Sequence, residues 1–198
     1  DGSVASQKTM LDMAIRAFEK YFPNVDCPFS RDTLGSISFL DCSEFCIQSS
    51  KSVRDLLDFI GENTESLSVP TTPQLKTLVI TGSGTRAMYI VKELREFNKN
   101  LSPLPLFFHG GGRKKEQTKT HESVLSNSKA VVAVSLPSRL VDATKKGLVD
   151  VDKLELVIVD LKANEKGVNV LSQKDTMHDV LTFIGQFTLS STKMVKIA

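Results

Sequence analysis

The sequence predicts an α/β fold in which a mostly parallel sheet is flanked by helices. Short, continuously apolar runs alternate along the chain with segments whose apolar residues recur at helical spacing, a pattern typical of crossover units that bury a parallel sheet on both faces. The length of 198 residues and the hydrophobic content of 40% are sufficient for one substantial core. The candidate strands are 75–81, 104–109, 130–135, 154–160 and, more weakly, 194–198.

Helices are expected between these strands, where apolar residues return every three or four positions. After Thr85, for example, Ala87, Ile90, Val91 and Leu94 form one stripe that would dock on the sheet. The expected helices in this part of the chain are 85–97, 140–148 and 177–187.

The first fifty residues differ from the rest and are expected to form an extension of the domain. Met10, Ala14, Phe18 and Tyr21 line one face of an N-terminal helix. The stretch that follows, up to Ser50, has mixed polarity and little periodicity, so we expect an irregular arm. The expected division is 1–50 for the helix and the extended arm and 51–198 for the domain.

Charge and composition exclude several classes of function. The 25 Lys and Arg residues nearly balance the 23 Asp and Glu residues, so a nucleic acid would have to bind a local basic surface. No apolar run approaches the roughly 20 residues that cross a bilayer, and the N-terminus has no signal-peptide pattern, so we expect neither a membrane nor a secreted protein. Cys27, Cys42 and Cys46 are an odd number of cysteines without metal-ligand spacing, so we expect free thiols and no metal.

The turn after the first strand, Thr-Gly-Ser-Gly-Thr-Arg-Ala, lies where phosphate-binding loops occur. It lacks the lysine of a nucleotide phosphate loop and the third glycine of a dinucleotide loop. What remains is a flexible turn with Gly84, Thr85 and Arg86 at a helix N-terminus, which suits an anion such as a backbone phosphate. A plain turn with a solvated arginine accounts for the same residues equally well.

A glycine-rich and basic stretch, His-Gly-Gly-Gly-Arg-Lys-Lys, follows the second strand. Gly110 and Gly111 let the backbone approach a ligand closely, while Arg113, Lys114 and Lys115 add positive charge, a combination that suits a nucleic-acid backbone. A mobile loop with a charged tip is the alternative interpretation.

A further helix entrance follows the third strand. Pro137 and Ser138 suit the first turn of a helix, and Arg139 adds a cation there. A plain helix start is the alternative. Asp160 ends the fourth strand, at the edge where open parallel sheets bind their ligands.

The order of these pieces resembles the first RecA-like domain of a DEAD-box RNA helicase. A strand with Thr-Arg-Ala, then Gly-Gly, Pro-Ser-Arg-Leu and Val-Ile-Val-Asp-Leu-Lys-Ala follow one another in the family's order between residues 75 and 165. In that family the first three motifs hold the sugar-phosphate backbone of RNA. The resemblance therefore implies RNA contacts at Thr85 and Arg86, Gly110 and Gly111, and Pro137, Ser138 and Arg139.

The departures from the helicase pattern fall on its catalytic side. Of the Asp-Glu-Ala-Asp motif only the first acid is present, as Asp160. Leu161 replaces the carboxylate that would activate water, and Lys162 and Ala163 follow. No phosphate loop precedes the first predicted strand. The resemblance thus implies a helicase-like fold without enzymatic activity and without a cofactor.

A narrower family fits this pattern, since the chain is similar to the helicase-like small-subunit biogenesis factors of the Cms family. The positions that carry the similarity are the helix 55–59, the turn 136–140 and the strand 156–160. Membership implies a non-catalytic assembly factor of the small-subunit processome, or 90S pre-ribosome, in the nucleolus of the nucleus. Its partners would be pre-ribosomal RNA and processome proteins, with no membrane and no small-molecule substrate. The expected anionic-ligand face is Gly84, Arg86, Gly111, Arg113, Lys114, Lys115 and Arg139.

Two other functions stay open at this point. One is a pure protein-interaction scaffold in which contact with RNA is incidental. The other is a residual nucleotide-binding or ATP-dependent RNA helicase-like protein with residues 82–85 as a distorted phosphate loop. The missing lysine and Leu161 argue against the latter.

Overall fold

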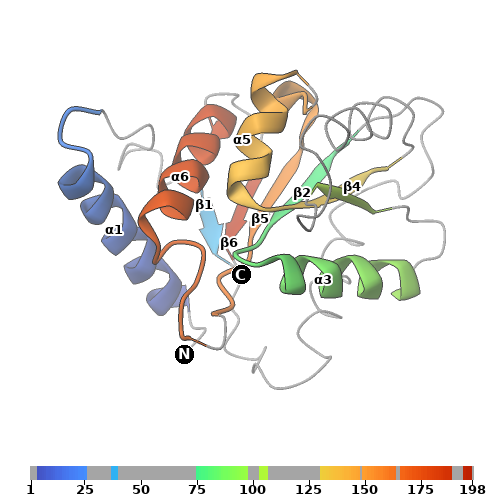
Figure 1. Ribbon diagram of the computed structural model, residues 1–198, viewed down its shortest axis with the longest axis horizontal. Helices are drawn as coiled ribbons and strands as arrows, with labels where there is room; N and C mark the ends of the chain where they lie inside the picture. The colour runs from blue at the N-terminus through green and yellow to red at the C-terminus, as the bar shows by residue number, and fades with distance from the viewer. Residues whose placement is uncertain are drawn as a thin grey trace, which may run out of the picture.

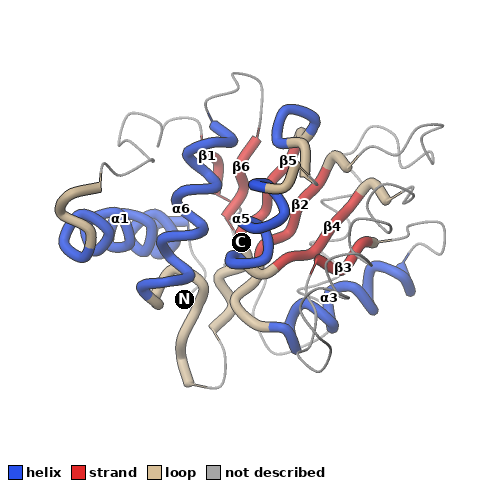
Figure 2. The backbone as a smooth tube through the Cα atoms, turned by 45° about the horizontal axis from the view of Figure 1, so that its top comes forward, coloured by secondary structure: helices blue, strands red, loops and turns tan. Residues whose placement is uncertain are grey.

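The computed structural model describes residues 4–25, 37–39, 75–97, 103–106, 130–147, 149–163, 166–188 and 194–197. In this part of the chain one sheet has the strand order β1-β6-β5-β2-β4-β3, and every described pairing is parallel. Figures 1 and 2 show the strands side by side with helices on both faces, so the predicted α/β fold is confirmed. The strands are β1 (Ile37–Phe39), β2 (Thr77–Ile80), β3 (Leu104–Leu106), β4 (Val132–Ser135), β5 (Leu156–Val159) and β6 (Met194–Ile197).

The centre of the sheet is buried on both faces. Every residue of β2, β4 and β5 is buried. Leu78 and its neighbours in register, Ala133 and Val157, belong to the larger of two core clusters. Val79, one residue further along β2, belongs to the smaller cluster on the opposite face. Burial on both faces explains why these strands are almost entirely apolar in the sequence, with Thr77 and Ser135 as the polar exceptions in β2 and β4.

Helices cover both faces. α3 (Gly84–Phe97) packs its apolar stripe on the smaller cluster. α5 (Pro137–Lys145) and α6 (Lys174–Thr188) cover the other face, and α1 (Val4–Tyr21) lies beside α6 (Figure 1). A short 3₁₀ helix, η2 (Val151–Lys153), precedes β5. None of the described helices is long and apolar enough to cross a membrane.

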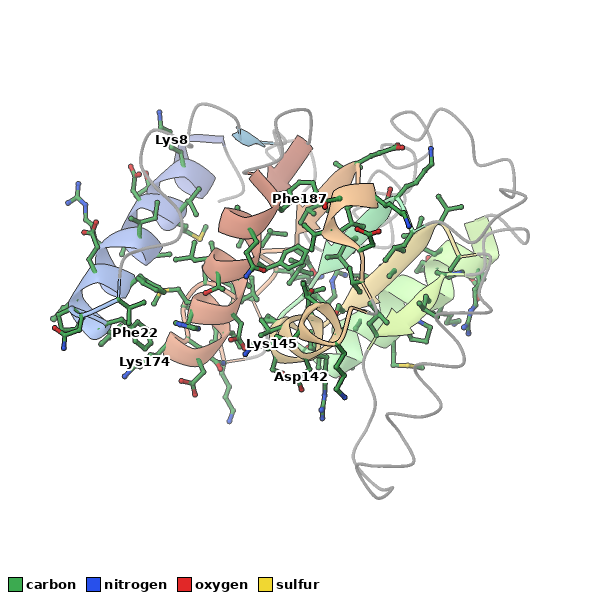
Figure 3. The ribbon with its side chains drawn as sticks, turned by 90° about the horizontal axis from the view of Figure 1, so that it is seen from above. Lys8, Phe22, Asp142, Lys145, Lys174 and Phe187 are labelled. Carbon is green, nitrogen blue, oxygen red and sulfur yellow. The ribbon has the colours of Figure 1, made fainter. Side chains whose placement is uncertain are left out.

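Aromatic contacts fix α1 to α6. The fully buried ring of Phe18 stacks on the imidazole of His178 with 5.4 Å between ring centroids, and the ring of Phe22 lies 4.9 Å from the same imidazole. Figure 3 shows Phe22 close to Lys174, whose Nζ lies 4.9 Å from the centroid of the Phe22 ring. α1 is therefore part of the same core as the sheet.

The predicted face of α1 is correct in part. Ala14 and Phe18 are buried as expected, but Tyr21 is 51% exposed. The buried stripe instead includes Leu11 and Ile15, because spacings of three, four and seven residues from Leu11 place all four side chains on the face that meets α6.

β1 was not foreseen by the expectation of an irregular arm before Ser50. It has only three residues, Ile37–Phe39, too few to show a periodicity, and it pairs in parallel with β6 at the edge of the sheet. The helix 55–59, which carries part of the similarity to the Cms family, lies outside the described residues. The other predicted strands and helices correspond to β2–β6 and to α3, α5 and α6.

Thr77 provides a test of the buried sheet. Its side chain is fully buried on the α3 side, and its hydroxyl has no hydrogen-bond partner in the described structure. Because valine has the same shape without the unsatisfied hydroxyl, Thr77→Val is expected to raise the free energy of unfolding by about 1 kcal/mol. Urea unfolding followed by circular dichroism measures it. Thr144→Val is the control, since its hydroxyl donates to the Leu140 carbonyl oxygen at 2.9 Å and its loss should not stabilise. A lower stability of Thr77→Val would contradict the conclusion that the Thr77 hydroxyl is buried without a hydrogen-bond partner.

Candidate functional site

The carboxyl ends of β2 and β5 form the topological switch point of the sheet. The chain leaves β2 into α3 on one face and leaves β5 toward α6 on the other face. Two backbone bonds join the strand ends: the Thr81 amide donates to the Ser135 carbonyl oxygen at 3.1 Å, and the Asp160 amide to the Ile80 carbonyl oxygen at 2.8 Å. Open parallel sheets bind ligands at such a point, so this edge is the candidate site.

The turn between β2 and α3 is held from two sides. The Ser83 hydroxyl accepts a hydrogen bond from the Arg86 amide at 3.2 Å and so caps the helix. On the other side, a Cβ placed on Gly82 would lie 3.3 Å from the Val170 backbone nitrogen, in the segment between β5 and α6. A side chain here would require the Val170 backbone to shift by a few tenths of an ångström, so glycine suits this close approach and the turn is packed against the segment before α6.

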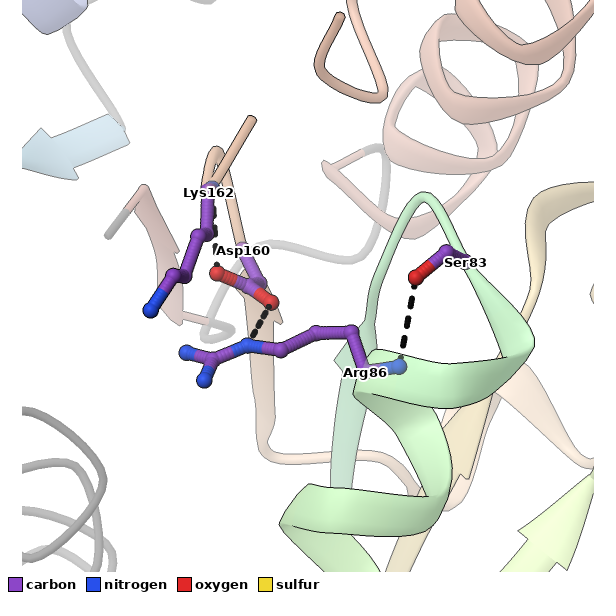
Figure 4. A network of polar contacts seen from close by, with 4 residues as sticks. All are labelled: Ser83, Arg86, Asp160 and Lys162. Atoms are coloured by element: carbon purple, nitrogen blue, oxygen red, sulfur yellow. Dashed lines mark hydrogen bonds and ion pairs between the residues drawn. The ribbon is translucent and has the colours of Figure 1, made fainter. Parts of the chain in front are cut away.

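Arg86 and Asp160 form an ion pair across the switch point. The Arg86 Nε donates to the Asp160 Oδ2 at 3.0 Å, and the side chains are only 16% and 7% exposed, respectively. The backbone amide of Lys162 donates to the other carboxylate oxygen, Oδ1, at 3.1 Å. Figure 4 shows these contacts together with the Ser83 cap. Both oxygens of Asp160 are thus engaged by protein donors.

The guanidinium of Arg86 is also positioned by an aromatic ring. Its Cζ lies 5.8 Å from the centroid of the Tyr89 ring, which is 36% exposed on α3. A guanidinium at that distance from a ring face gains a favourable cation–π contact. Arg86 is therefore held by Asp160 on one side and by Tyr89 on α3.

Leu161 occupies the position after Asp160, where the helicase pattern has its water-activating acid. It is 8% exposed and belongs to the larger core cluster together with Val170 and Leu171. An apolar side chain in the core provides neither a proton acceptor nor a metal ligand. In the described residues no group of three or more His, Cys, Asp or Glu side chains is arranged to hold a metal ion.

The start of α5 contributes a second set of predicted positions at the same sheet edge. Leu136 is the N-cap without a side-chain hydrogen bond, and Pro137, the first helical residue, is buried. Ser138 and Arg139 are exposed. The Arg139 amide donates to the Leu136 carbonyl oxygen at 3.1 Å, which places Arg139 in the first turn of the helix.

The structure brings some of the predicted RNA-side positions to one edge. Gly84 and Thr85 begin α3 after β2, and the start of α5 follows β4, which is the neighbour of β2. Thr85 is exposed, whereas Gly84 is half-buried. The remaining predicted positions, Gly110, Gly111, Arg113, Lys114 and Lys115, lie outside the described residues.

Sequence reasoning missed the pairing of Arg86 with Asp160 and the positions of Tyr89 and Lys162 beside it. The pair is separated by 74 residues, so no local spacing reveals it. The available signal is topological: an acid at the end of one strand and an arginine in the first turn after another strand meet when those strands are neighbours in the sheet.

Comparison with solved structures shows the fold. The structure is similar to the crystal structure of a hypothetical ATP-dependent RNA helicase from Sulfolobus tokodaii, with a TM-score of 0.55 and 18% sequence identity. The match covers 96% of this chain and 50% of the helicase chain. The fold is therefore that of a RecA-like helicase domain, and the chain spans about half the length of that relative.

Comparison of sequences shows the family. The chain is 29% identical to Protein CMS1 from Chaetomium thermophilum over 102 residues, which cover 51% of this chain and 39% of that protein. The family model described as CMS1, a U3-containing 90S pre-ribosomal complex subunit, matches residues 25–196. Because this match takes in most of the sheet and the whole candidate site, the chain belongs to the CMS1 family of ribosome-biogenesis factors.

Proposed function

We propose that this chain is a non-catalytic, helicase-like assembly factor of the small-subunit processome that binds pre-ribosomal RNA and processome proteins in the nucleolus. Family membership supports the place in the 90S pre-ribosome. The observation that carries the rest is the engagement of both Asp160 oxygens by Arg86 and by the Lys162 amide. This arrangement uses the acid retained from the helicase pattern as a structural anchor.

The absence of hydrolysis is supported by what the switch point offers chemically. Phosphoryl transfer needs a metal held by carboxylates and a residue that orients the attacking water. Here the carboxylate of Asp160 is neutralised by Arg86, and Leu161 is packed in the core. These residues leave no group at this position to orient water.

RNA binding is supported by the exposed groups along the same sheet edge. Thr85 and Ser138 present hydroxyl groups, and Arg139 presents a cation, each in the first turn of a helix that starts at this edge. Helix N-termini, hydroxyl groups and arginines are the donors that hold phosphate oxygens in protein–RNA contacts. Such contacts grip the backbone without reading the base sequence.

The test is the salt dependence of RNA binding by the full chain. Arg139→Ala is expected to weaken binding of a single-stranded oligouridylate about tenfold, the cost of one charged hydrogen bond. It should also reduce the slope of log K against log salt by about 0.7, because one phosphate contact is lost. Fluorescence anisotropy over a salt series measures both quantities. Arg139 is the better probe than Arg86, since Arg139 is exposed and its removal leaves no buried charge behind.

Arg95→Ala is the matched control. Arg95 is also an exposed arginine, but it lies in the last turn of α3 and therefore toward the amino ends of the strands, away from the candidate site. Equal effects of the two variants would mean that binding follows net charge and not this edge. Salt-independent binding would refute the RNA part of the proposal, and sustained turnover of ATP with magnesium by the same preparation would refute the non-catalytic part.

A further inference from the structure

We infer that Arg86 and Lys162 form a two-cation site for one RNA phosphodiester, and that Asp160 is the positioning residue that holds both. This inference rests on the proposed RNA-binding function and adds Lys162 and Asp160 to the residues expected to act in it. Three features carry it: the unused donors of Arg86, the placement of Lys162, and the charge balance of the cluster.

Arg86 keeps donors available after pairing with Asp160. Only its Nε is used in the ion pair, and in the described structure its Nη1 and Nη2 groups have no hydrogen-bond partner. Figure 4 shows the guanidinium extending past Asp160, away from Ser83, with its two Nη groups at the far end of the side chain. A guanidinium in this orientation can hold phosphate oxygens through two parallel N–H bonds.

Lys162 brings a second cation to the same side. Its backbone amide donates to the Asp160 Oδ1, which fixes the start of its side chain, and the side chain itself is exposed. Figure 4 shows its ammonium group on the side toward which the Arg86 guanidinium extends. One carboxylate thus organises two cations through its two oxygens.

The charge balance indicates a phosphodiester. Arg86 and Lys162 carry two positive charges and Asp160 one negative charge, so the cluster has a net charge of plus one. A phosphodiester carries one negative charge and would make the cluster neutral. Terminal phosphates carry close to two at neutral pH and would leave an excess. The internal linkage of a nucleic acid therefore matches this site better than the end of a nucleotide does.

The first experiment replaces Lys162, an exposed residue whose removal leaves no cavity. Lys162→Ala is expected to weaken binding of an oligouridylate of about 12 nucleotides by three- to tenfold and to reduce the salt slope by about 0.7. Lys145→Ala is the matched control, because Lys145 is an exposed lysine in the last turn of α5, toward the amino ends of the strands and away from the candidate site. The control should bind as the native chain does.

The second experiment separates positioning from charge. Asp160→Asn keeps the shape of the side chain but removes its negative charge. If Asp160 acted on RNA only through its negative charge, RNA would bind more tightly to this variant, because the repulsion between the carboxylate and the phosphates is gone. If Asp160 positions Arg86 and Lys162, binding should become weaker, and we expect a loss of at least threefold. Asp142→Asn, the same change on the exposed face of α5, is the control and should not weaken binding.

The outcomes distinguish this site from the general function. If the native chain shows no salt-dependent binding of RNA, both the proposed function and this site are refuted. If the native chain binds and Arg139→Ala weakens binding, but Lys162→Ala matches Lys145→Ala, the two-cation site alone is refuted. Tighter binding by Asp160→Asn refutes the positioning role. Displacement of the RNA by magnesium-free ATP at an equal concentration of phosphate groups would assign the site to free nucleotides instead.

Discussion

An Arg86→Ala variant is expected to lose about 3–5 kcal/mol of the free energy of unfolding. The reason is what the substitution leaves behind. Asp160 is 7% exposed, and its carboxylate would remain at the switch point with one neutral amide donor and without its ion-pair partner. An uncompensated buried charge is among the most costly defects in a folded protein. For a domain with an ordinary stability of about 5–15 kcal/mol, this loss is a large fraction of the total.

The measurement is urea unfolding of a set of four variants with the native chain as reference. Asp160→Ala should be nearly as destabilising as Arg86→Ala, because it leaves the guanidinium without its anion. The double variant Arg86→Met with Asp160→Leu should be much less destabilised than either single change, since no buried charge remains. Lys92→Ala breaks the exposed pair with Glu96 on the same helix and should change stability by no more than about 0.5 kcal/mol.

A double variant that loses as much stability as the two single variants together would contradict this account. That result would mean that Arg86 and Asp160 are each hydrated and do not depend on each other. A loss below about 1 kcal/mol for Arg86→Ala would mean the same, because that is the usual range of exposed ion pairs.

The sequence was sufficient for most of the sheet because burial on both faces leaves a strong pattern. The run containing Leu78 and Val79 is mostly apolar, and the stripe of α3 repeats at helical spacing, so each element is visible locally. β1 was missed because three residues at a sheet edge carry no such pattern. Tyr21 was assigned to the wrong face because the spacing of α1 allows two overlapping stripes, and packing on α6 selects the one with Leu11 and Ile15.

The sequence predicts that the candidate site lies at the carboxyl ends of the strands, but it does not predict which residues contact each other there. Asp160 and Arg86 were each recognised from their places next to strands, yet their ion pair depends on β2 and β5 being neighbours. Neighbour relations between strands far apart in the sequence are set by tertiary packing. The part played by the Lys162 amide follows only from that geometry. A sequence pattern shows which charged or polar residues lie at the ends of strands. The order of the strands in the sheet decides which of these residues come into contact.

A Phe18→Ala variant is expected to lose about 3–5 kcal/mol, the usual cost of removing a fully buried phenylalanine side chain. Phe18 is 0% exposed, stacks on His178 of α6 and lies 5.0 Å from Phe22 between ring centroids. Loss of the ring leaves a cavity between α1 and α6. Other contacts of α1, such as the hydrogen bond from Asn169 to the Met10 sulfur at 3.4 Å, remain but do not replace the lost packing.

The same variant tests whether α1 folds together with the sheet, which matters because α1 precedes the residues 25–196 that match the family. If the helix and the sheet are one cooperative unit, Phe18→Ala lowers the midpoint of a single urea transition, and hydrogen exchange accelerates in β2 as well as in α1. Met13→Ala is the control, because Met13 lies on the same helix and is 64% exposed. It should change the free energy of unfolding by no more than about 0.5 kcal/mol and should leave the exchange pattern unchanged. Faster exchange confined to α1, with an unchanged midpoint, would instead show that the helix detaches by itself from a sheet that stays folded without it.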